Sequence, residues 1–215
     1  MGADNRIVIL GSPASGKSTL ALQLGELLAT DVIHLDQLFW NPGWVPTPDE
    51  EMDRMAIEAA NGEAWIIDGN YSRTIEYRLQ RATMVVYLDL NRYICTYRAL
   101  KRWVLNRGKT RPDLADDCPE KIDLEFLRYI FDYPKQSGRR IERILREREA
   151  RRSGGGSNEG EGEVCEGGGG SGNGETSNAA YARVDNNLQV HILRSRKEIQ
   201  RFVKAFEQTF EQTIY

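Results

Sequence analysis

Five short apolar runs alternate along the chain with longer segments in which apolar residues recur every three or four positions. Short continuous apolar runs are typical of buried parallel strands, whereas the three-to-four spacing is typical of amphipathic helices. This alternation predicts an α/β fold with a five-stranded parallel sheet between helices. The predicted strands cover residues 6–10, 32–36, 64–69, 83–89 and 188–193.

Start signals delimit several of the helices. Thr47 before Pro48 predicts an N-cap followed by a first helical position, and residues 195–198 form a capping box. The helix that begins at Asn91 carries an apolar stripe that we expect to pack inward, formed by Tyr93, Tyr97, Leu100 and Val104. Further helices are predicted after residue 18, over 47–60, 72–80, 121–131 and 135–152, and after 195, with 41–46 as a loop.

Residues 153–180 differ in composition from the rest of the chain. They are mostly Gly, Ser, Glu and Asn, with no basic residue and almost no apolar one. Such a segment buries too little apolar surface to offset the entropy of ordering, so we expect a disordered insert, with a sheltering or regulatory role as the weaker alternative. Because a predicted strand follows it, the insert interrupts a single domain over 1–215 and does not separate two.

The loop between the first strand and the first helix carries the clearest chemistry. Residues 11–18 fit the pattern G-x-x-x-x-G-K-[ST], the phosphate-binding P-loop. Glycines let backbone N–H groups approach phosphates, Lys17 supplies a cation, and Ser18 supplies a hydroxyl ligand for Mg²⁺. The loop predicts binding of ATP and Mg²⁺ by Gly11, Ser12, Pro13, Ala14, Ser15, Gly16, Lys17, Ser18 and Thr19.

Two acidic residues, Asp36 and Asp68, lie at the ends of predicted strands. Ligands of parallel sheets bind at the carboxyl ends of the strands, which is also the edge of the P-loop. We expect Asp68 to hold Mg²⁺ through water beside the substrate, and a cap of the following turn is the alternative. Asp36 is expected to take a proton from an acceptor hydroxyl or to orient the substrate, although a solvated strand end fits equally well.

A basic stretch follows the fourth predicted strand and extends into residues 106–120. Arg98 and Arg102 lie one helical turn apart, on a face away from the apolar stripe. Clustered arginines in an irregular segment can fold over phosphates as a lid, which gives catalytic roles to Arg98, Arg102, Arg107 and Arg111. A solvated helix face is one alternative. Binding of nucleic acid is another, weakened by the short stretch and the net charge of −3.

Aromatic residues follow Asp36 in the sequence. Trp40, with Phe39 and Trp44, can stack on a ring of the acceptor or can simply pack as a cover over the acceptor site. His34 is expected to pack in the sheet.

Composition narrows the setting. The three cysteines are scattered without a C-x-x-C pair, so neither a zinc site nor a disulfide framework is indicated, and a reduced compartment fits. No apolar run reaches membrane-spanning length, and the first predicted strand begins too early for a signal peptide. We expect a cytoplasmic monomer or weak dimer that acts on a small molecule.

At residues 11–18 and 68–74 the sequence resembles the adenylate-kinase type of P-loop kinase. The third strand of that group ends in Asp-Gly-Phe-Pro-Arg-Thr, and its arginine binds the acceptor phosphate. The matching stretch here is Asp-Gly-Asn-Tyr-Ser-Arg-Thr, with one extra residue before the arginine. The resemblance implies that Arg73 binds an acceptor phosphate and that Arg194, after the last strand, flanks the adenine.

A longer set of short motifs extends over nearly the whole chain except the Gly-rich insert, at residues 34–36, 39–40, 42–45, 65–72, 107–113, 118–121 and 193–195. In these motifs the chain resembles the topology modulation protein (FlaR-like) group. The group has the architecture of a small-molecule kinase, while its name reports an effect linked to DNA topology. The resemblance and the P-loop together imply an ATP-dependent phosphotransferase of the nucleoside/nucleotide-kinase type, with a nucleotide or nucleoside as acceptor. A regulatory ATPase associated with DNA is the alternative, and no N-K-x-D motif supports a GTPase.

Overall fold

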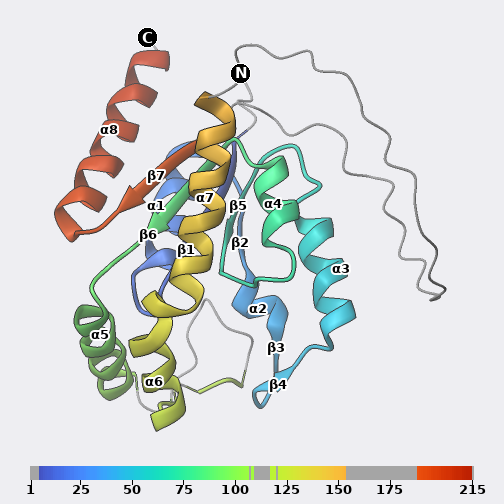
Figure 1. Ribbon diagram of the computed structural model, residues 1–215, viewed down its shortest axis with the longest axis vertical. Coiled ribbons are helices and arrows are strands. Elements are labelled where there is room, and N and C mark those ends of the chain that lie inside the picture. Colours follow the sequence, from blue (N-terminus) through green and yellow to red (C-terminus); the bar gives the residue numbers. More distant parts are fainter. Residues whose placement is uncertain (1–4, 107, 109–116, 120, 154–187, 215) are drawn as a thin grey trace, which may run out of the picture.

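A five-stranded parallel sheet forms the centre of the computed structural model, which describes residues 5–106, 108, 117–119, 121–153 and 188–214 (Figure 1). The order of the strands is β2-β5-β1-β6-β7. The predicted α/β fold and parallel sheet are thereby confirmed. The strands are β1 (Arg6–Gly11), β2 (Val32–His34), β5 (Trp65–Asp68), β6 (Met84–Leu88) and β7 (Gln189–Leu193).

Strand order reverses at β1. The chain leaves β1 for β2 on one side of the sheet and later adds β6 and β7 on the other side. In open parallel sheets, ligands bind beyond the carboxyl ends of the strands at such a point. The P-loop follows β1 directly, so it lies at the point of reversal.

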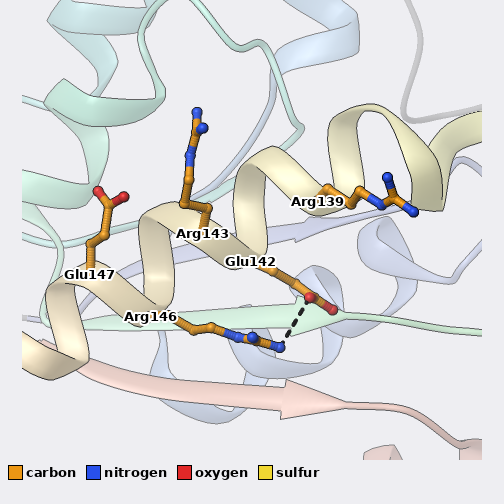
Figure 2. Close-up of a pocket in the computed structure, with 5 residues that line it drawn as sticks. All are labelled: Arg139, Glu142, Arg143, Arg146 and Glu147. Carbon is orange, nitrogen blue, oxygen red and sulfur yellow. Dashed lines mark hydrogen bonds and ion pairs between the residues drawn. The ribbon is translucent and has the colours of Figure 1, made fainter.

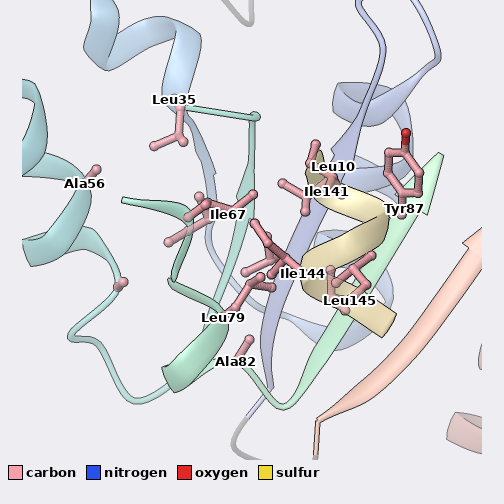
Figure 3. Close-up of a cluster of buried hydrophobic side chains, with 14 of the residues drawn as sticks. Leu10, Leu35, Ala56, Ile67, Leu79, Ala82, Tyr87, Ile141, Ile144 and Leu145 are labelled. Atoms are coloured by element: carbon pink, nitrogen blue, oxygen red, sulfur yellow. The ribbon is translucent and has the colours of Figure 1, made fainter. Parts of the chain in front are cut away.

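Helices cover both faces of the sheet (Figure 1). Alternate residues of β1 point to opposite faces, so Ile7 and Ile9 pack with α1 (Lys17–Leu28) and α8 (Arg196–Ile214). Val8 and Leu10 pack on the other face with α3 (Asp49–Ala59), α4 (Ile75–Arg81) and α7 (Ser137–Ser153). Figure 3 shows this second cluster, in which Ile141, Ile144 and Leu145 of α7 lie against the strands.

Two groups of elements flank the carboxyl edge of the sheet (Figure 1). On one side lie α5 (Arg92–Leu105) and α6 (Leu124–Asp132), followed by the short turn η1 (Tyr133–Lys135). On the other side lie α2 (Leu35–Phe39) and a two-stranded hairpin of β3 (Trp40–Asn41) and β4 (Val45–Pro46), where a loop was predicted. These two groups bracket the P-loop.

The predicted inward stripe on the helix of residues 92–105 is wrong. Tyr93, Tyr97 and Val104 are 68%, 64% and 64% exposed, and Leu100 is exposed as well. Cys95 and Ala99 form the buried face of α5 instead. Their small side chains let the helix lie close to its neighbours, a tertiary constraint that outweighs the pattern of large apolar residues.

Two local predictions near the start of α3 also fail. The predicted strand 32–36 ends at His34, and Asp36 lies in the first turn of α2. Thr47 is not the N-cap of α3, because its hydroxyl donates to the Leu38 carbonyl at 2.8 Å and Pro48 takes the cap position.

The capping box of α8 is confirmed. The Glu198 N–H donates to the Ser195 hydroxyl at 3.2 Å, and the Glu198 carboxylate accepts the Arg194 N–H at 2.8 Å. The predicted insert 153–180 lies outside the described residues apart from Ser153, and so does most of the predicted lid 106–120. Among the described residues, no helix has both the length and the apolar character needed to cross a membrane.

A comparison of a buried side chain of α7 with an exposed one of α5 tests the fold. Leu145 is fully buried under the sheet, so Leu145→Ala should lower the free energy of unfolding by about 2–5 kcal/mol. Tyr97→Ala should change it by only about 0.5 kcal/mol, because the ring already faces solvent. Urea denaturation of both variants measures the difference. Comparable losses would mean that the stripe on α5 is buried after all.

Candidate active site

The P-loop requires glycine at its first position. Gly11 has φ 149°, and a Cβ added there would lie 2.7 Å from the Leu88 carbonyl oxygen of the neighbouring strand. The loop then turns through Ala14, in the left-handed region at φ 58°, and closes with a hydrogen bond from Ser15 N to the Ser12 oxygen at 3.1 Å. The tight packing against β6 fixes where the loop begins.

Polar groups converge on the inside of this loop. The first hydrogen bond of α1 runs from Leu20 N to the Gly16 oxygen at 3.0 Å, so the turn before it presents its N–H groups toward the loop. Lys17 Nζ folds back onto the Ser12 carbonyl at 3.2 Å. The hydroxyls of Ser12 and Ser15 are buried; that of Ser12 interacts with the Cys95 thiol of α5, and that of Ser15 has no hydrogen-bond partner within the described part of the chain. This set of donors fits a bound polyphosphate.

Asn70 holds Gly11 at both of its backbone polar groups. Its Oδ1 accepts the Gly11 N–H at 3.0 Å, and its Nδ2 donates to the Gly11 carbonyl at 2.8 Å. The Tyr133 hydroxyl of η1 donates to the same Oδ1 at 3.2 Å. Burial raises the pKa of Tyr133, so this hydroxyl keeps its proton. One amide thus joins the end of β5, the P-loop and the turn after α6.

Arg78 braces the loop that carries Asn70. Its guanidinium is fully buried and donates to the carbonyls of Gly69 at 2.9 Å, Asn70 at 3.0 Å and Tyr71 at 2.8 Å. Burial lowers the pKa of Arg78 to about 10, so the group is still charged at neutral pH. Gly69 is needed in this loop, because a Cβ at its φ of 131° would lie 2.7 Å from the Leu35 Cβ.

Sequence reasoning missed both of these residues. The signal for Asn70 was its place directly after the strand-ending pair Asp68-Gly69. Arg78 gave no signal, because an arginine in a short polar helix normally faces solvent.

Asp68 and His34 form a buried pair at the ends of adjacent strands. The register of β2 and β5 places them side by side, and His34 Nδ1 lies 3.1 Å from Asp68 Oδ2. His34 does lie in the sheet as expected, but its orienting contact with Asp68 was not foreseen.

The residues present fit a magnesium ion that is held largely by phosphate and water. Within the described ranges, no group of three or more His, Cys, Asp or Glu side chains is arranged to bind a metal. Mg²⁺ is usually bound through one or two protein oxygens together with substrate phosphates. The sequence predicts that Ser18 and Asp68 supply those oxygens, and this stays a prediction.

One arginine of the predicted lid reaches the P-loop. Arg98 of α5 donates from Nη1 to the Ser15 carbonyl at 3.0 Å. Arg102 lies one turn further along α5 and is half-buried. Arg107 and Arg111 lie outside the described residues, so their predicted roles stay predictions.

The hairpin after Asp36 packs as a cover. Trp40 makes edge-on contacts with Phe39 and Trp44, at centroid distances of 4.7 and 5.2 Å. Trp44 Nε1 donates to the Pro119 carbonyl at 3.1 Å, and Lys121 Nζ lies 4.6 Å from the centroid of its ring. The hairpin is thus attached to the segment before α6, across the edge of the sheet.

Asp36 itself is exposed on α2 and lies close enough to Tyr129 of α6 to influence it. Burial is the main cause that raises the pKa of Tyr129, and the negative charge of Asp36 adds to it. Two elements on opposite sides of the edge therefore approach each other at these residues.

Two arginines that the resemblance assigns to ligands are held by carboxylates. Arg73 pairs with Asp53 at 2.7 Å and with Asp49 at 3.3 Å, both on α3. Arg194 pairs with Asp89 at 3.3 Å. Their predicted ligand contacts stay predictions.

A groove on α7 is lined by charged side chains of both signs and contains none of the P-loop residues (Figure 2). Glu142 and Arg146 form an ion pair at 3.3 Å within it. Such mixed charge on one helix is typical of a solvated face. The residues that line the groove are Arg139, Glu142, Arg143, Arg146 and Glu147.

No protein-family model and no curated protein matches the chain, so the resemblance to the FlaR-like group stays a prediction. Among solved structures, a shikimate kinase from Bacteroides thetaiotaomicron is 14% identical with a TM-score of 0.47, over 96% of this chain and 98% of that one. A gluconokinase from Sinorhizobium meliloti 1021 is 15% identical with a TM-score of 0.36, over 66% and 97%. A sugar kinase from Janibacter sp. HTCC2649 is 18% identical with a TM-score of 0.35, over 62% and 95%. Because these TM-scores are below 0.5, the chain's own residues carry the assignment of function.

Removal of the Asn70 amide should weaken nucleotide binding. Asn70→Ala leaves the N–H and carbonyl of Gly11 without their partner, which costs about 1–3 kcal/mol, so the Kd for Mg–ATP should rise roughly tenfold or more. Asn61→Ala is the matched control, because Asn61 precedes β5 at the opposite edge of the sheet. Calorimetric titration of both variants measures the effect. An Asn70→Ala protein that binds ATP within twofold of the wild type would show that the contact does not hold the loop.

Proposed function

We propose that this chain is an ATP-dependent phosphotransferase of the nucleoside/nucleotide-kinase type, which moves the γ-phosphoryl group of Mg–ATP to a hydroxyl of a small acceptor. One observation carries the proposal. A phosphate cradle at the end of β1 lies at the same edge of the sheet as the carboxylates of Asp36 and Asp68, which come from different elements.

Phosphoryl transfer depends mainly on positioning and on neutralising charge. The N–H groups of the P-loop and Lys17 hold the phosphates, and Arg98 places a second cation beside the loop. Ser18 and Asp68 are proposed to hold Mg²⁺, which would offset the negative charge of the phosphates. Arg102, Arg107 and Arg111 are proposed as further cations of the transition state.

Asp36 is proposed to act on the acceptor. Its carboxylate lies at the surface and would accept the proton that leaves the attacking hydroxyl. Its place in the first turn of α2 brings it toward α6, so an acceptor bound between these helices would lie next to it.

A regulatory ATPase associated with DNA is the rival. No contact of the described residues favours it, and the chain as a whole carries a formal net charge of −3, which does not favour a polyanionic partner.

Transfer of label from γ-labelled ATP to a panel of small alcohols, including nucleosides and nucleoside monophosphates, tests the proposal. We expect a labelled product with the wild type and a loss of at least about 100-fold with Lys17→Ala, because a transition-state cation is removed. Lys101→Ala is the control, since Lys101 is exposed on α5. Label that goes only to inorganic phosphate, whatever alcohol is added, would favour the ATPase.

Substitution of Asp36 and of Asp68 should have different effects on the kinetics. Asp36→Asn should lower kcat by roughly 100-fold or more while the Kd for ATP stays the same, because general-base catalysis typically contributes that much. Asp68→Asn should instead raise the concentration of Mg²⁺ needed for half-maximal rate. Rate measurements over a Mg²⁺ series distinguish the two variants, and identical Mg²⁺ profiles would contradict the roles given to them.

A further inference from the structure

Arg73, the arginine expected to bind an acceptor phosphate, has all three of its guanidinium nitrogens in contact with carboxylates. Nε lies 3.1 and 2.9 Å from the two oxygens of Asp53, Nη2 lies 2.7 Å from Asp53 Oδ2, and Nη1 lies 3.3 Å from Asp49 Oδ2. This bidentate arrangement is the strong form of an arginine–carboxylate pair. The hydrogen bond from Arg73 also lowers the pKa of Asp53. An acceptor phosphate would have to displace both carboxylates.

The other arginines of this side of the site are held by protein groups as well. The wall opposite α5 and α6 is formed by residues 35–81, all of which the structure describes. Arg78 is buried against three carbonyls, and Arg81 donates to the Ala60 and Asn61 carbonyls. Arg54 pairs with Glu51 at 3.9 Å on the exposed side of α3.

The wall is acidic overall. Residues 35–81 contain nine acidic residues and four basic ones, all arginine, for a formal charge of −5. Basic residues gather instead on α5, from which Arg98 reaches the P-loop. Residues 35–81 are thus acidic as a whole, although Glu76 is paired with Arg148 of α7, and the basic residues of α5 lie on the side of the P-loop.

The wall presents the carboxylate of Asp36 at its surface. Asp36 is exposed in the first turn of α2. Phe39 ends the same helix, and its ring lies 4.7 Å from that of Trp40 and 6.2 Å from that of Tyr71, packed against the core. A phosphate or carboxylate on the acceptor would be repelled by Asp36. A neutral or cationic alcohol would meet a proton acceptor there without this repulsion.

We propose that the acceptor is an alcohol that carries no phosphate and no carboxylate, such as a nucleoside and not a nucleotide. Arg73 then serves to fasten the loop after β5 to α3. This inference rests on the proposed kinase function and narrows it, since that function alone allows either acceptor.

Matched pairs of an alcohol and its phosphate monoester test the inference by turnover. Adenosine with AMP and thymidine with TMP are examples, and ADP release and labelled product are followed for each member. We expect kcat/KM to favour the unphosphorylated member of any productive pair by about tenfold or more. Transfer that prefers the monophosphate would overturn the inference while leaving the kinase function intact. ATP consumption that no member of the panel stimulates would count against the kinase function itself.

A measurement of anion binding tests the inference without any need for turnover. The protein is saturated with a non-hydrolysable ATP analogue and Mg²⁺, and is then titrated calorimetrically with inorganic phosphate and with AMP. We expect no second anion site in the millimolar range. A site that is present in the wild type and lost in Arg73→Ala would overturn the inference.

Controls separate a structural loss from a lost ligand contact. Arg73→Lys keeps one positive charge without the bidentate fork, so it should lower the melting temperature without producing or removing an anion site. Arg54→Ala, on the same helix as Asp49 and Asp53 but outside their cluster, is the matched variant for an exposed arginine.

Discussion

The site depends on the contact between the Asn70 amide and the backbone of Gly11. A loop that binds phosphate must leave its N–H groups directed inward, so it cannot satisfy them within itself. Its position must therefore be set from outside. Asn70 does this with two hydrogen bonds of opposite direction to one residue, at 3.0 and 2.8 Å.

Asn70, which positions the P-loop, is itself held in place by contacts from two different elements. From α4, the Arg78 guanidinium donates to the backbone carbonyls of Gly69, Asn70 and Tyr71. From the turn after α6, the Tyr133 hydroxyl donates to the side-chain amide oxygen of Asn70. Arg78 cannot be replaced by a neutral residue without leaving buried carbonyls unpaired. Tyr133 connects the P-loop to the helices that carry the predicted lid. The P-loop, the end of β5 and the turn η1 after α6 are thus parts of one hydrogen-bonded unit.

The sequence was sufficient for the sheet and the P-loop, and insufficient for the contacts that position them. Strands such as β1 are continuous apolar runs because helices cover both faces of the sheet, and this pattern can be recognised in the sequence alone. The inward stripe of α5 was misjudged because close approach of the helix to its neighbours selects the small Cys95 and Ala99, not the large Tyr93 and Tyr97. Asp36 was placed at a strand end because hydrophobicity alone does not show that β2 stops at His34. Arg78, Asn70 and the Arg73–Asp53 pair join residues that are distant in sequence or lie on different elements, so no local pattern reveals them.

The most direct test of this account is a crystal structure of the protein with Mg²⁺ and a non-hydrolysable ATP analogue. The account predicts that the triphosphate lies inside residues 11–18, with the Asn70 amide still bound to both backbone groups of Gly11 and with Asp68 on the metal side of the phosphates. A triphosphate bound elsewhere, or a loop that binds it only after Asn70 has left Gly11, would contradict the claim that this amide holds the phosphate site in place.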